Sequence, residues 1–580
     1  MQTNYTADPA PMVHEGRLYL YTSHDEDVSI DNFYTMNDWR LYSTVDMVNW
    51  TDHGSPASYK TFSWGTGDAW APQGIAKDGK FFLFVPLNNA TGAKIGVGVA
   101  NNPAGPFMDP LGKALAASGS GNIDPTVFID DDGQAYMYWG NGTLRYVKLN
   151  SDMTSYSGSV TNVSLSGFVE GPWFYKRGSL YYMVYAGSGG TEKISYATSN
   201  APIGPWTTRG DIMAAGSTYT NHSGVVDYKG HSYFFYHNNT LPGGGDFKRS
   251  VCVEEFTYGD DGTIPKLTMS TKGPTGIATL NPFQQVEAET IAFSAGLKTE
   301  ACTDTGGGIQ VSSISNGDYI KVKDVDFLDG VTSFDARVTS AASNAKIELH
   351  LDSQTGTSLG TCDVSGASSW TTKTCSVSGG SGKHDLFLKF TGGSGDLFKF
   401  NWWKFDGPNT GGTGGMGGMG GMSGIGGAGV GGIAGGSAAG NGGTAGQDPS
   451  STGGRDGGAG HAGATVAGGG GVSASGGSAG ATGGSSAASG GSTAASGGSA
   501  VATGGSGGAG VGGAATGGSP VGAGGRGVPV AGSGVGAAPA NPDSGTSCGC
   551  RVGGDGSNRT LAWAPWLVAS VLLLRRRRGA

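Results

Sequence analysis

The chain contains 580 residues and carries a formal net charge of -9 at pH 7, from 36 Lys and Arg against 45 Asp and Glu. A single hydrophobic core rarely organises so long a chain, so more than one domain is expected. No basic cluster precedes the terminal arginines, which argues against nucleic acid as a partner because the charge that holds a phosphate backbone is missing. The Trp and Tyr residues of the first 406 positions suit a neutral sugar polymer, which proteins hold through aromatic faces and hydrogen bonds.

Five segments in the first half of the chain share a turn that ends in Gly, followed by an aromatic-rich apolar run. These segments are Gly16–Tyr21, Gly79–Phe84, Gly133–Tyr138, Gly178–Met183 and Gly230–Phe235. They recur at intervals of about 45 to 63 residues, which is the length of one four-stranded propeller blade. The sequence therefore predicts an all-β fold that begins with a five-bladed β-propeller over residues 1–275.

The residues eight or nine positions before these glycines are expected to occupy equivalent positions on successive blades. The residues at this offset are Asp8, Trp70, Asp124, Glu170 and His222. Because the innermost strands surround one channel, these side chains should meet at its mouth. A lone Asp-Pro is more often a turn opener, and a lone carboxylate is more often a solvated surface charge. Three acids in one shared register favour a common site.

Three converging carboxylates suit glycoside hydrolysis. One carboxylic acid protonates the leaving oxygen, and a carboxylate activates water or attacks the anomeric carbon. A third negative group nearby raises the pKa of the acid by repulsion between like charges. This chemistry requires no cofactor.

Short motifs around these acids resemble those of glycoside hydrolase family 43, which comprises five-bladed arabinofuranosidases, xylosidases and arabinanases. The motifs are Ala7-Asp8-Pro9, Ala69-Trp70-Ala71-Pro72, Ile123-Asp124-Pro125-Thr126, Glu170-Gly171-Pro172-Trp173 and Arg249-Ser250-Val251. The resemblance covers roughly residues 3–274. It implies an inverting mechanism in which Asp8 is the general base, Asp124 the pKa modulator and orienter, and Glu170 the general acid. Inversion would place the carboxyls of Asp8 and Glu170 roughly 6.5 to 9.5 Å apart.

The same resemblance implies three substrate-binding residues. Trp70 would form part of the sugar pocket, His222 would be the channel histidine, and Arg249 would contact the substrate or the modulating Asp124. A hydrogen-bonded structural role for His222 and a purely ion-pairing role for Arg249 are the alternatives.

Segments near the start look closest to the branch of arabinoxylan arabinofuranohydrolases and xylosidases. These segments are Asn4–Asp8, His24–Asp27 and Phe33-Tyr34 with Trp39. We therefore expect removal of arabinofuranosyl or xylosyl units from xylan or arabinoxylan, and the sequence does not separate the two activities. The alternative from another class is a non-catalytic, polysaccharide-binding surface protein. A retaining enzyme acting on fructans is disfavoured, because the Asn-Asp-Pro-Asn-Gly, Arg-Asp-Pro and Glu-Cys motifs of such enzymes are absent.

Residues 283–406 resemble a family 6 carbohydrate-binding module, a β-sandwich of jelly-roll type. The motifs are Val286-Glu287-Ala288-Glu289, Asn316-Gly317-Asp318-Tyr319-Ile320 and Asn401-Trp402-Trp403-Lys404-Phe405. The resemblance implies a structural calcium, for which Glu287, Glu289 and Asp406 are the candidate ligands. Ser313 and Ala367 stand where such modules place two sugar-binding aromatic residues, so we do not expect binding in the usual cleft. We expect Tyr319 and Trp370 to be packing residues.

The remaining features concern the cysteines and the C-terminal part. Cys362 and Cys375 bracket a short polar hairpin, which favours a disulfide formed in an oxidising compartment. Residues 407–547 consist almost entirely of Gly, Ala, Ser and Thr, which predicts a disordered linker.

Residues 548–580 contain Cys548-Gly549-Cys550, an apolar run from Leu561 to Leu574 and the block Arg575–Arg578. These three parts resemble the myxobacterial sorting signals that a myxosortase processes, which implies secretion and retention at the cell surface. The first residues lack the pattern of a signal peptide, so we expect that the true N-terminus is missing from this chain.

Overall fold

The computed structural model describes residues 3–188 and 191–408. The predicted sorting signal and nearly all of the predicted linker therefore lie outside the described residues. Regular structure in the described part consists of β-strands and one short 3-10 helix, η1 (Tyr59–Thr61), which confirms the predicted all-β class. No helix in the described ranges has the length and apolar character needed to cross a membrane.

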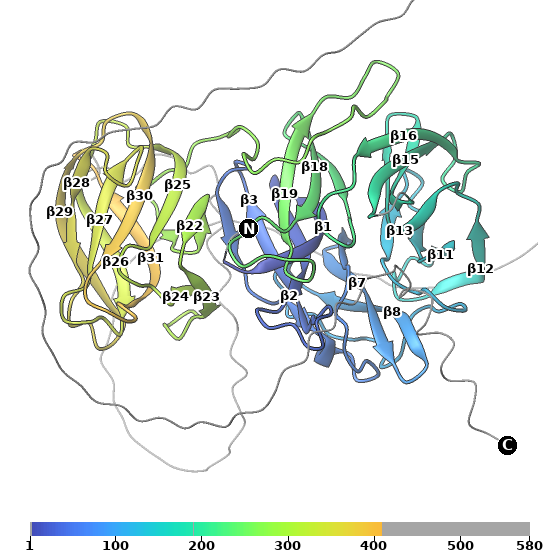
Figure 1. Cartoon of the computed structure of the whole chain (residues 1–580), viewed down its shortest axis with the longest axis horizontal. Helices are drawn as coiled ribbons and strands as arrows, with labels where there is room; N and C mark the ends of the chain where they lie inside the picture. Colours follow the sequence, from blue (N-terminus) through green and yellow to red (C-terminus); the bar gives the residue numbers. More distant parts are fainter. Residues whose placement is uncertain (1–2, 189–190, 409–580) are drawn as a thin grey trace, which may run out of the picture. The chain divides into compact units, whose positions relative to one another are not determined.

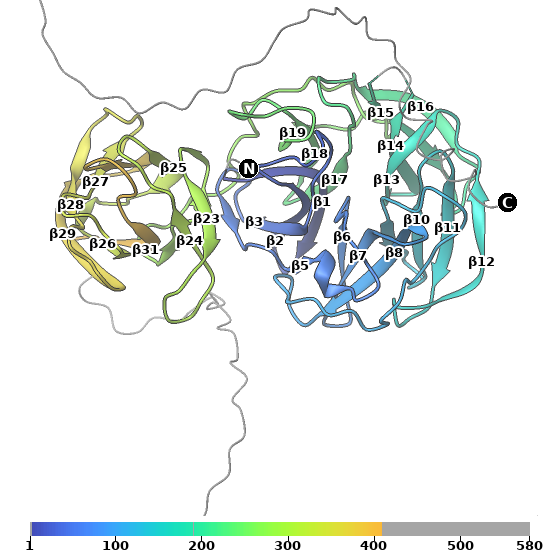
Figure 2. The same ribbon diagram turned by 60° about the horizontal axis from the view of Figure 1, so that its bottom comes forward.

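Five antiparallel sheets follow one another along residues 5–256 (Figures 1 and 2). The first contains β1 (Tyr5–His14), β2 (Arg17–Asp25), β3 (Asp38–Thr44), β4 (Trp50–Asp52), β5 (Ala57–Ser58) and the later strand β21 (Thr290–Ile291). The second contains β6 (Gln73–Lys77), β7 (Lys80–Asn89) and β8 (Gly92–Ala100). The third contains β9 (Thr126–Ile129), β10 (Ala135–Trp139), β11 (Leu144–Leu149) and β12 (Tyr156–Val163). The fourth contains β13 (Phe168–Arg177), β14 (Leu180–Gly187), β15 (Lys193–Ser199) and β16 (Thr207–Met213). The fifth contains β17 (Gly224–Tyr228), β18 (His231–Asn238) and β19 (Ser250–Phe256).

The first strands of these sheets lie against one another in sequence. Strand β1 contacts both β17 and β6, β6 contacts β9, and β9 contacts β13. The indole N–H of Trp173 in β13 donates to the carbonyl of Val225 in β17 at 2.9 Å, which closes the circuit. Figure 2 shows these sheets standing around a common centre, as in a β-propeller. The residues that begin the first strands are thereby brought together.

Neighbouring sheets pack face to face, which explains the long apolar runs. Phe84 and Val97 of the second sheet share a core with Met137 and Trp139 of the third. Strand β7 is accordingly buried continuously from Phe81 to Leu87 and shows no in-and-out alternation. A sheet that is covered on both faces has no polar side to alternate with.

Two further sheets form a β-sandwich around a separate core (Figure 1). One contains β20 (Val286–Glu287), β23 (Lys298–Ala301), β24 (Ile309–Ser312), β26 (Val331–Thr339), β29 (Thr371–Gly379) and β31 (Lys399–Asp406). The other contains β22 (Phe293–Ala295), β25 (Tyr319–Asp326), β27 (Lys346–Leu351), β28 (Ser358–Asp363) and β30 (Lys383–Thr391). Along β26 the residues Phe334, Ala336 and Val338 are buried in alternation, as expected for a sheet with one solvated face.

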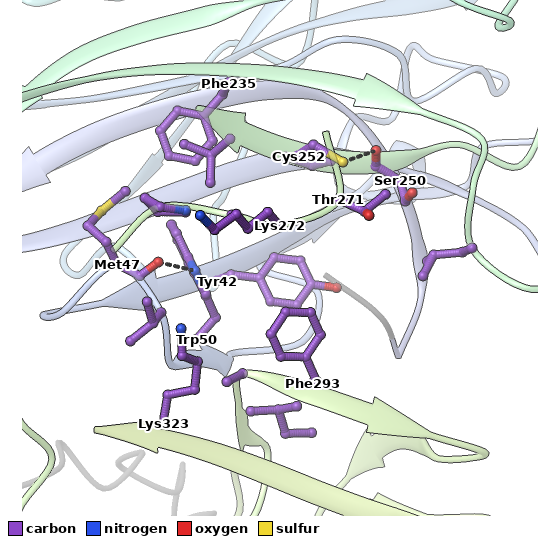
Figure 3. Close-up of a pocket in the computed structure, with 18 of the residues that line it drawn as sticks. Tyr42, Met47, Trp50, Phe235, Ser250, Cys252, Thr271, Lys272, Phe293 and Lys323 are labelled. Atoms are coloured by element: carbon purple, nitrogen blue, oxygen red, sulfur yellow. Dashed lines mark hydrogen bonds between the residues drawn. The ribbon is translucent and has the colours of Figure 1, made fainter. Parts of the chain in front are cut away.

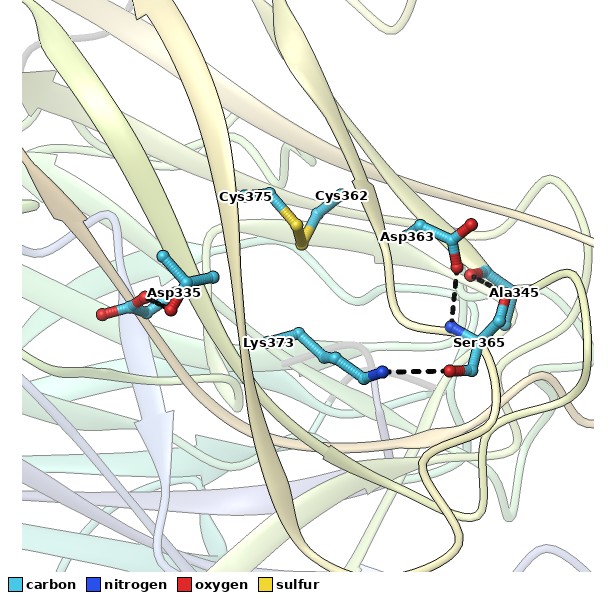
Figure 4. Close-up of a disulfide and its surroundings, with 8 residues drawn as sticks. Asp335, Ala345, Cys362, Asp363, Ser365, Lys373 and Cys375 are labelled. Atoms are coloured by element: carbon cyan, nitrogen blue, oxygen red, sulfur yellow. Dashed lines mark hydrogen bonds between the residues drawn. A yellow bond between two sulfur atoms is a disulfide. The ribbon is translucent and has the colours of Figure 1, made fainter.

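Cys362 and Cys375 form a disulfide, as the sequence predicts (Figure 4). Cys362 lies in β28 and Cys375 in β29, so the bond joins the two sheets of the sandwich at neighbouring edge strands. Closing a loop of this length in the unfolded chain contributes about 3 kcal/mol of stability in the chain-entropy picture.

Candidate active site

The backbone is irregular at the acids picked out by the sequence. The pairing of β1 with β2 shifts register between Ala7 and Ala10, and that of β13 with β14 shifts on both sides of Glu170. Asp8 and Asp124 both adopt the left-handed conformation, with φ of 53° and 57°. Bulges re-aim side chains, and strained backbone gathers at functional sites. Asp8 in β1 and Glu170 in β13 are thus re-aimed within their strands, and Asp124 lies just ahead of β9.

Asp8 is buried among positive and hydrogen-bonding groups. The hydroxyl of Ser23 donates to Oδ2, and Nη1 of Arg249 lies 3.2 Å from Oδ1. Nδ1 of His237 and Nδ1 of His222 lie 3.6 and 3.9 Å from the same oxygen. Burial alone would raise the pKa of Asp8, but Arg249 and then the other groups lower it to about 2. Asp8 is therefore a carboxylate at any pH near neutrality.

Arg249 is buried between two carboxylates. Its Nε and Nη2 each donate to Asp25 at 2.9 Å, and its backbone N–H donates to the same group at 2.8 Å. Its third side-chain nitrogen, Nη1, contacts Asp8 and the hydroxyl of Thr220, both at 3.2 Å. The ring of Tyr34 lies 4.6 Å from the guanidinium carbon. One cation thus compensates Asp25, which is fully buried, and Asp8.

The two histidines beside Asp8 have different contacts. Nε2 of His237 donates to the carbonyl of Thr220 at 2.9 Å, which leaves Nδ1 as the acceptor for the N–H of Asp8 at 3.3 Å. Burial, followed by the charge of Arg249, lowers the pKa of His237 to about 3, so this ring is neutral. Burial also lowers the pKa of His222. The His222 ring lies so close to Gly171 that a Cβ there would meet Nδ1 at 3.1 Å, and φ of +58° at Gly171 also favours glycine.

The surroundings of Asp124 and Glu170 raise the pKa values of these carboxyls, whereas the surroundings of Asp8 lower its pKa. The N–H of Gly171 donates to Oδ2 of Asp124 at 3.0 Å, and the Asn141 amide donates to Oε2 of Glu170. Burial raises the pKa of Asp124 well above its usual value, and the charges of Glu170 and Asp8 raise it further. Burial also raises the pKa of Glu170; the Asn141 amide opposes this effect and the charge of Asp8 adds to it. Carboxyls whose environments drive their pKa values apart are typical of acid and base partners.

A fourth carboxyl, Glu192, joins this group. It immediately precedes β15, and its Oε2 accepts the N–H of Asn221 at 2.9 Å. The charge of Glu170 also acts on its carboxyl. Burial and then the charge of Glu170 raise the pKa of Glu192 to about 8.

Trp70 lies two residues before Pro72 and just ahead of β6, the strand that contacts both β1 and β9. Its carbonyl accepts the indole N–H of Trp39 at 2.6 Å, which fixes the backbone. Its own indole N–H is buried and finds no acceptor among the described residues. Such a donor suits a ligand hydroxyl.

The sequence reasoning missed Ser23, Asp25, Asn141, Glu192 and His237 as members of this site. Some of these residues could have been found from the pairing of the first two strands of each sheet. Tyr5 pairs with Asp25 and Ala7 with Ser23, so the polar end of the second strand lies opposite the start of the first. His237 likewise lies at the last-but-one position of β18, the second strand of the fifth sheet.

A separate pocket lies away from these acids (Figure 3). Its lining includes Tyr42, Trp50, Phe235, Phe293 and Lys323. None of the candidate catalytic carboxyls contributes to its lining, so it is not the candidate active site.

The three candidate calcium ligands of the sandwich lie at its β20 end and at the end of β31: Glu287 ends β20, Glu289 follows two residues later, and Asp406 ends β31. Glu289 is buried, its Oε2 has no hydrogen-bond partner among the described residues, and its pKa is raised by burial and then by Glu287. Glu287 pairs with Trp402 on β31, so Asp406 lies four residues further along, about 13 Å at the rise of a strand. Asp406 is instead held by Lys404 at 2.9 Å and the hydroxyl of Ser333 at 3.0 Å.

The positions of the usual sugar cleft in the sandwich carry small side chains. Ser313 is exposed and Ala367 is buried. The indole of Trp370 donates to the hydroxyl of Thr303 at 3.0 Å, and the ring of Tyr319 lies 5.8 Å from that of Phe387. The packing roles predicted for Trp370 and Tyr319 agree with these contacts.

Comparison with known proteins places this geometry in a family. The family model of glycosyl hydrolases family 43 matches residues 2–264, and that of the carbohydrate binding module of family 6 matches residues 287–407. The arabinoxylan arabinofuranohydrolase of Bacillus subtilis (strain 168) is 35% identical over 464 residues, which cover 69% of this chain and 90% of that relative. The chain belongs to glycoside hydrolase family 43. It is therefore a glycosidase.

Two further similarities bear on this family 43 glycosidase. The xylosidase/arabinosidase 43A of Humicola insolens is 33% identical over 318 residues, which cover 45% of this chain and 96% of that enzyme. A crystal structure of a family 43 arabinoxylan arabinofuranohydrolase from Bacillus subtilis, in complex with cellotetraose, is 34% identical with a TM-score of 0.64. The alignment covers 70% of this chain and 96% of that one, so both folded parts have counterparts there.

The Arg249 contacts predict a pH-dependent loss of stability in Arg249→Met. Removing the cation leaves Asp8 and Asp25 buried without compensation, which destabilises a protein by about 3 to 5 kcal/mol. Without the cation, burial holds the pKa of Asp8 above that of the unfolded chain, so the loss of stability is largest near pH 7 and shrinks as pH falls toward about 4. Urea unfolding across this pH range measures it.

The matched control is Arg177→Met, which removes the exposed ion pair of Arg177 with Asp227 and should change stability by no more than about 1 kcal/mol. Equal stabilities of Arg249→Met and the native protein at pH 7 would contradict the role of Arg249.

Proposed function

We propose that this glycosidase removes arabinofuranosyl or xylosyl units from xylan or arabinoxylan by an inverting acid/base mechanism. The observation that carries the proposal is the opposed protonation of carboxyls in one site, with Asp8 held as a carboxylate and Glu170 and Asp124 held toward the protonated state. The names of the relatives support the substrate class, since they include arabinoxylan arabinofuranohydrolases and xylosidase/arabinosidases. The five sheets of the catalytic domain are the five blades of its propeller.

The proposed roles follow from the contacts of each carboxyl. Asp8 takes a proton from the attacking water, because it is ionised and its other partners hold it in place. Glu170 gives its proton to the glycosidic oxygen, for which its partial exposure leaves access. Asp124 is buried and orients the backbone of Gly171 next to the acid. Negative charge on Asp124 and negative charge on Glu170 disfavour each other, so the two carboxyls resist simultaneous ionisation. These steps need no cofactor.

Sugar binding is assigned to groups with free hydrogen-bonding capacity. The buried indole N–H of Trp70 and the buried side-chain amide N–H groups of Asn221 have no acceptor among the described residues. His222 lies between Asp8 and Gly171, where it can contact a bound sugar. The side-chain nitrogens of Arg249 are engaged by Asp25, Asp8 and Thr220, which favours its alternative role as an ion-pair partner.

A structural calcium in the sandwich is a further part of the proposal. Glu287 and Glu289 would supply its side-chain oxygens, and the unpartnered, buried Oε2 of Glu289 fits such a cation. Asp406 is left out of this proposed ligand set, because its carboxylate is engaged by Lys404 and Ser333. The ion would stabilise the module and take no part in hydrolysis.

The substrate assignment is tested by digesting wheat arabinoxylan and following the products by proton NMR. The spectrum identifies arabinose or xylose and also the anomer that forms first. We expect release of a pentose with inversion at the anomeric carbon. Absence of any released sugar, with retained binding to the polymer, would instead identify a polysaccharide-binding protein. A first-formed anomer of retained configuration would overturn the role of Asp8 as a base acting through water.

The role of Glu170 is tested by the substitution Glu170→Gln. On arabinoxylan, whose leaving group needs a proton, activity should fall by about 100- to 10,000-fold, the usual contribution of a general acid. On an aryl glycoside with a good leaving group the loss should be far smaller. Glu255→Gln serves as the matched control: Glu255 lies on β19, its ion pair with His231 of β18 is exposed, and the substitution should leave both rates unchanged. Equal losses of Glu170→Gln on both substrates would remove Glu170 from the acid role.

Retention at the cell surface through residues 548–580 is the last part of the proposal. Deleting the residues after Gly407 should leave the activity on arabinoxylan unchanged and release the enzyme into the medium of producing cells. Cell fractionation followed by activity measurement checks this. A truncated enzyme that still sediments with the cell envelope would contradict the sorting-signal assignment.

A further inference from the structure

Exposed apolar side chains gather in one connection of the first sheet. Nine large hydrophobic residues are well exposed in the described part of the chain, and three of them, Val28, Ile30 and Phe33, lie within six residues of one another. Their exposed fractions are 76%, 65% and 52%. All three belong to the connection 26–37 between β2 and β3. Single exposed apolar residues are common on protein surfaces, whereas a gathering of them marks a binding surface.

The backbone of this connection is held in a defined turn. The N–H of Phe33 donates to the carbonyl of Ile30 at 3.1 Å. The two residues between them, Asp31 and Asn32, are both left-handed, with φ of 55° and 51°. Turns with positive φ at both central positions favour Asn and Asp. The N–H of Ile30 also donates to the hydroxyl of Thr35 at 2.8 Å. The position of Phe33 is thus fixed in advance, so a ligand that binds there needs to order little of the loop.

The ring of Phe33 packs against two further aromatic rings. Its centroid lies 5.1 Å from that of Tyr34 and 5.6 Å from that of Phe247. The rings of Tyr34 and Phe247 meet edge to face at 4.7 Å. Phe247 belongs to the connection between β18 and β19 of the fifth sheet. Two sheets therefore supply one aromatic cluster, which consists of Phe33, Tyr34 and Phe247.

The aromatic cluster adjoins the proposed base. The ring of Tyr34 lies 4.6 Å from the guanidinium carbon of Arg249, and Nη1 of Arg249 lies 3.2 Å from Oδ1 of Asp8. The hydroxyl of Tyr34 lies 3.0 Å from that of Thr220, which fixes the ring from its other end. The cluster therefore extends from the surroundings of Asp8 to the protein surface, with Phe33 as its exposed member.

The chemistry and size of the cluster point to a sugar as its occupant. Proteins hold neutral sugars on aromatic faces. A stable protein interface takes about 20 to 30 residues from each partner, far more than three rings and two aliphatic side chains provide. A polymer that places one of its sugars at Asp8 has further sugars that extend past the neighbouring surface. The cluster is continuous with that position.

We propose that Phe33, supported by Tyr34 and Phe247, is a binding platform for a sugar unit of the xylan main chain that adjoins the cleaved pentose. The inference rests on the proposed function, which places that pentose between Asp8 and Glu170. Phe33 contacts no reacting atom and acts as a specificity-determining residue. Its contact with the main chain is made before and during the reaction alike, so it favours polymeric over small substrates through binding.

The test compares Phe33→Ala with the native enzyme on two substrates. One is an arabinoxylan oligosaccharide, and the other is a fluoride of the same pentose, which has no main chain. On the oligosaccharide, KM should rise about tenfold with kcat nearly unchanged, because a contact common to the ground state and the transition state is lost. On the fluoride both constants should keep their native values. A native KM on the oligosaccharide, or an equal loss on the fluoride, would overturn the proposal.

Two further variants control this comparison. Phe33→Tyr keeps an aromatic ring and should restore KM on the oligosaccharide to within about twofold of the native value. Leu328→Ala removes a side chain that is 62% exposed in the connection between β25 and β26, and it should change neither constant. A loss in Phe33→Tyr as large as that in Phe33→Ala would show that the ring is not what binds.

A binding measurement separates this inference from the proposed function. In the Glu170→Gln background, isothermal titration with xylohexaose should give a Kd about tenfold higher when Phe33→Ala is added. The two proteins differ at Phe33 alone, so any binding to the sandwich contributes equally to both. If the native protein releases no pentose from arabinoxylan, the proposed function fails while the Kd comparison still decides the platform.

If pentose is released and the Kd is the same with and without Phe33→Ala, the inference fails alone. Sedimentation velocity of Phe33→Ala and the native protein covers the remaining occupant. Weaker self-association of the variant, together with an unchanged Kd for xylohexaose, would overturn the platform and identify the cluster as a contact between copies of this chain.

Discussion

The site depends on one buried cation, Arg249, placed between two buried carboxylates. Removing a charge from water is expensive, so a buried ion pair persists only where hydrogen bonds satisfy both partners. Arg249 meets this condition with paired bonds to Asp25 and a single bond to Asp8. Asp25 thereby holds the guanidinium in place, and the guanidinium holds Asp8 as a carboxylate. The stability of the channel mouth and the state of the proposed base thus have a common cause.

The repeated hairpin is what brings these groups to one place. Each first strand starts, and each second strand ends, at the same edge of its sheet, as the pairing of Ala7 with Ser23 shows. The sequence predicted the all-β fold and the positions of Asp8, Asp124 and Glu170, because the repeats are periodic and the first strands share one offset. Asn141 and Glu192 could not be found in this way. They lie in connections whose course depends on packing between blades, and no local pattern reports that packing.

In the sandwich too, local sequence predicts some features, whereas others depend on which strands pair. Alternating burial along β26 and the Cys362–Cys375 bond follow from local sequence. The register between β20 and β31 joins segments that are far apart in the sequence. In this register Glu287 pairs with Trp402, and Asp406 lies four residues further along β31. A spacing in sequence could not supply that distance. The sequence likewise could not predict that Oε2 of Glu289 has no hydrogen-bond partner among the described residues, because this depends on its neighbours in the fold.

Charge counting explains why this site can act as an acid at all. Asp8, Asp25, Asp124, Glu170 and Glu192 gather around one committed cation, Arg249. If all five ionised, four negative charges would stand unbalanced in surroundings of low polarity, which costs far more than retaining protons. Arg249 favours the ionised form of Asp8, whereas burial favours the protonated forms of Asp124, Glu170 and Glu192. The shortage of cations near Glu170, together with the neighbouring acids, therefore raises its pKa and favours the protonated form that a general acid needs.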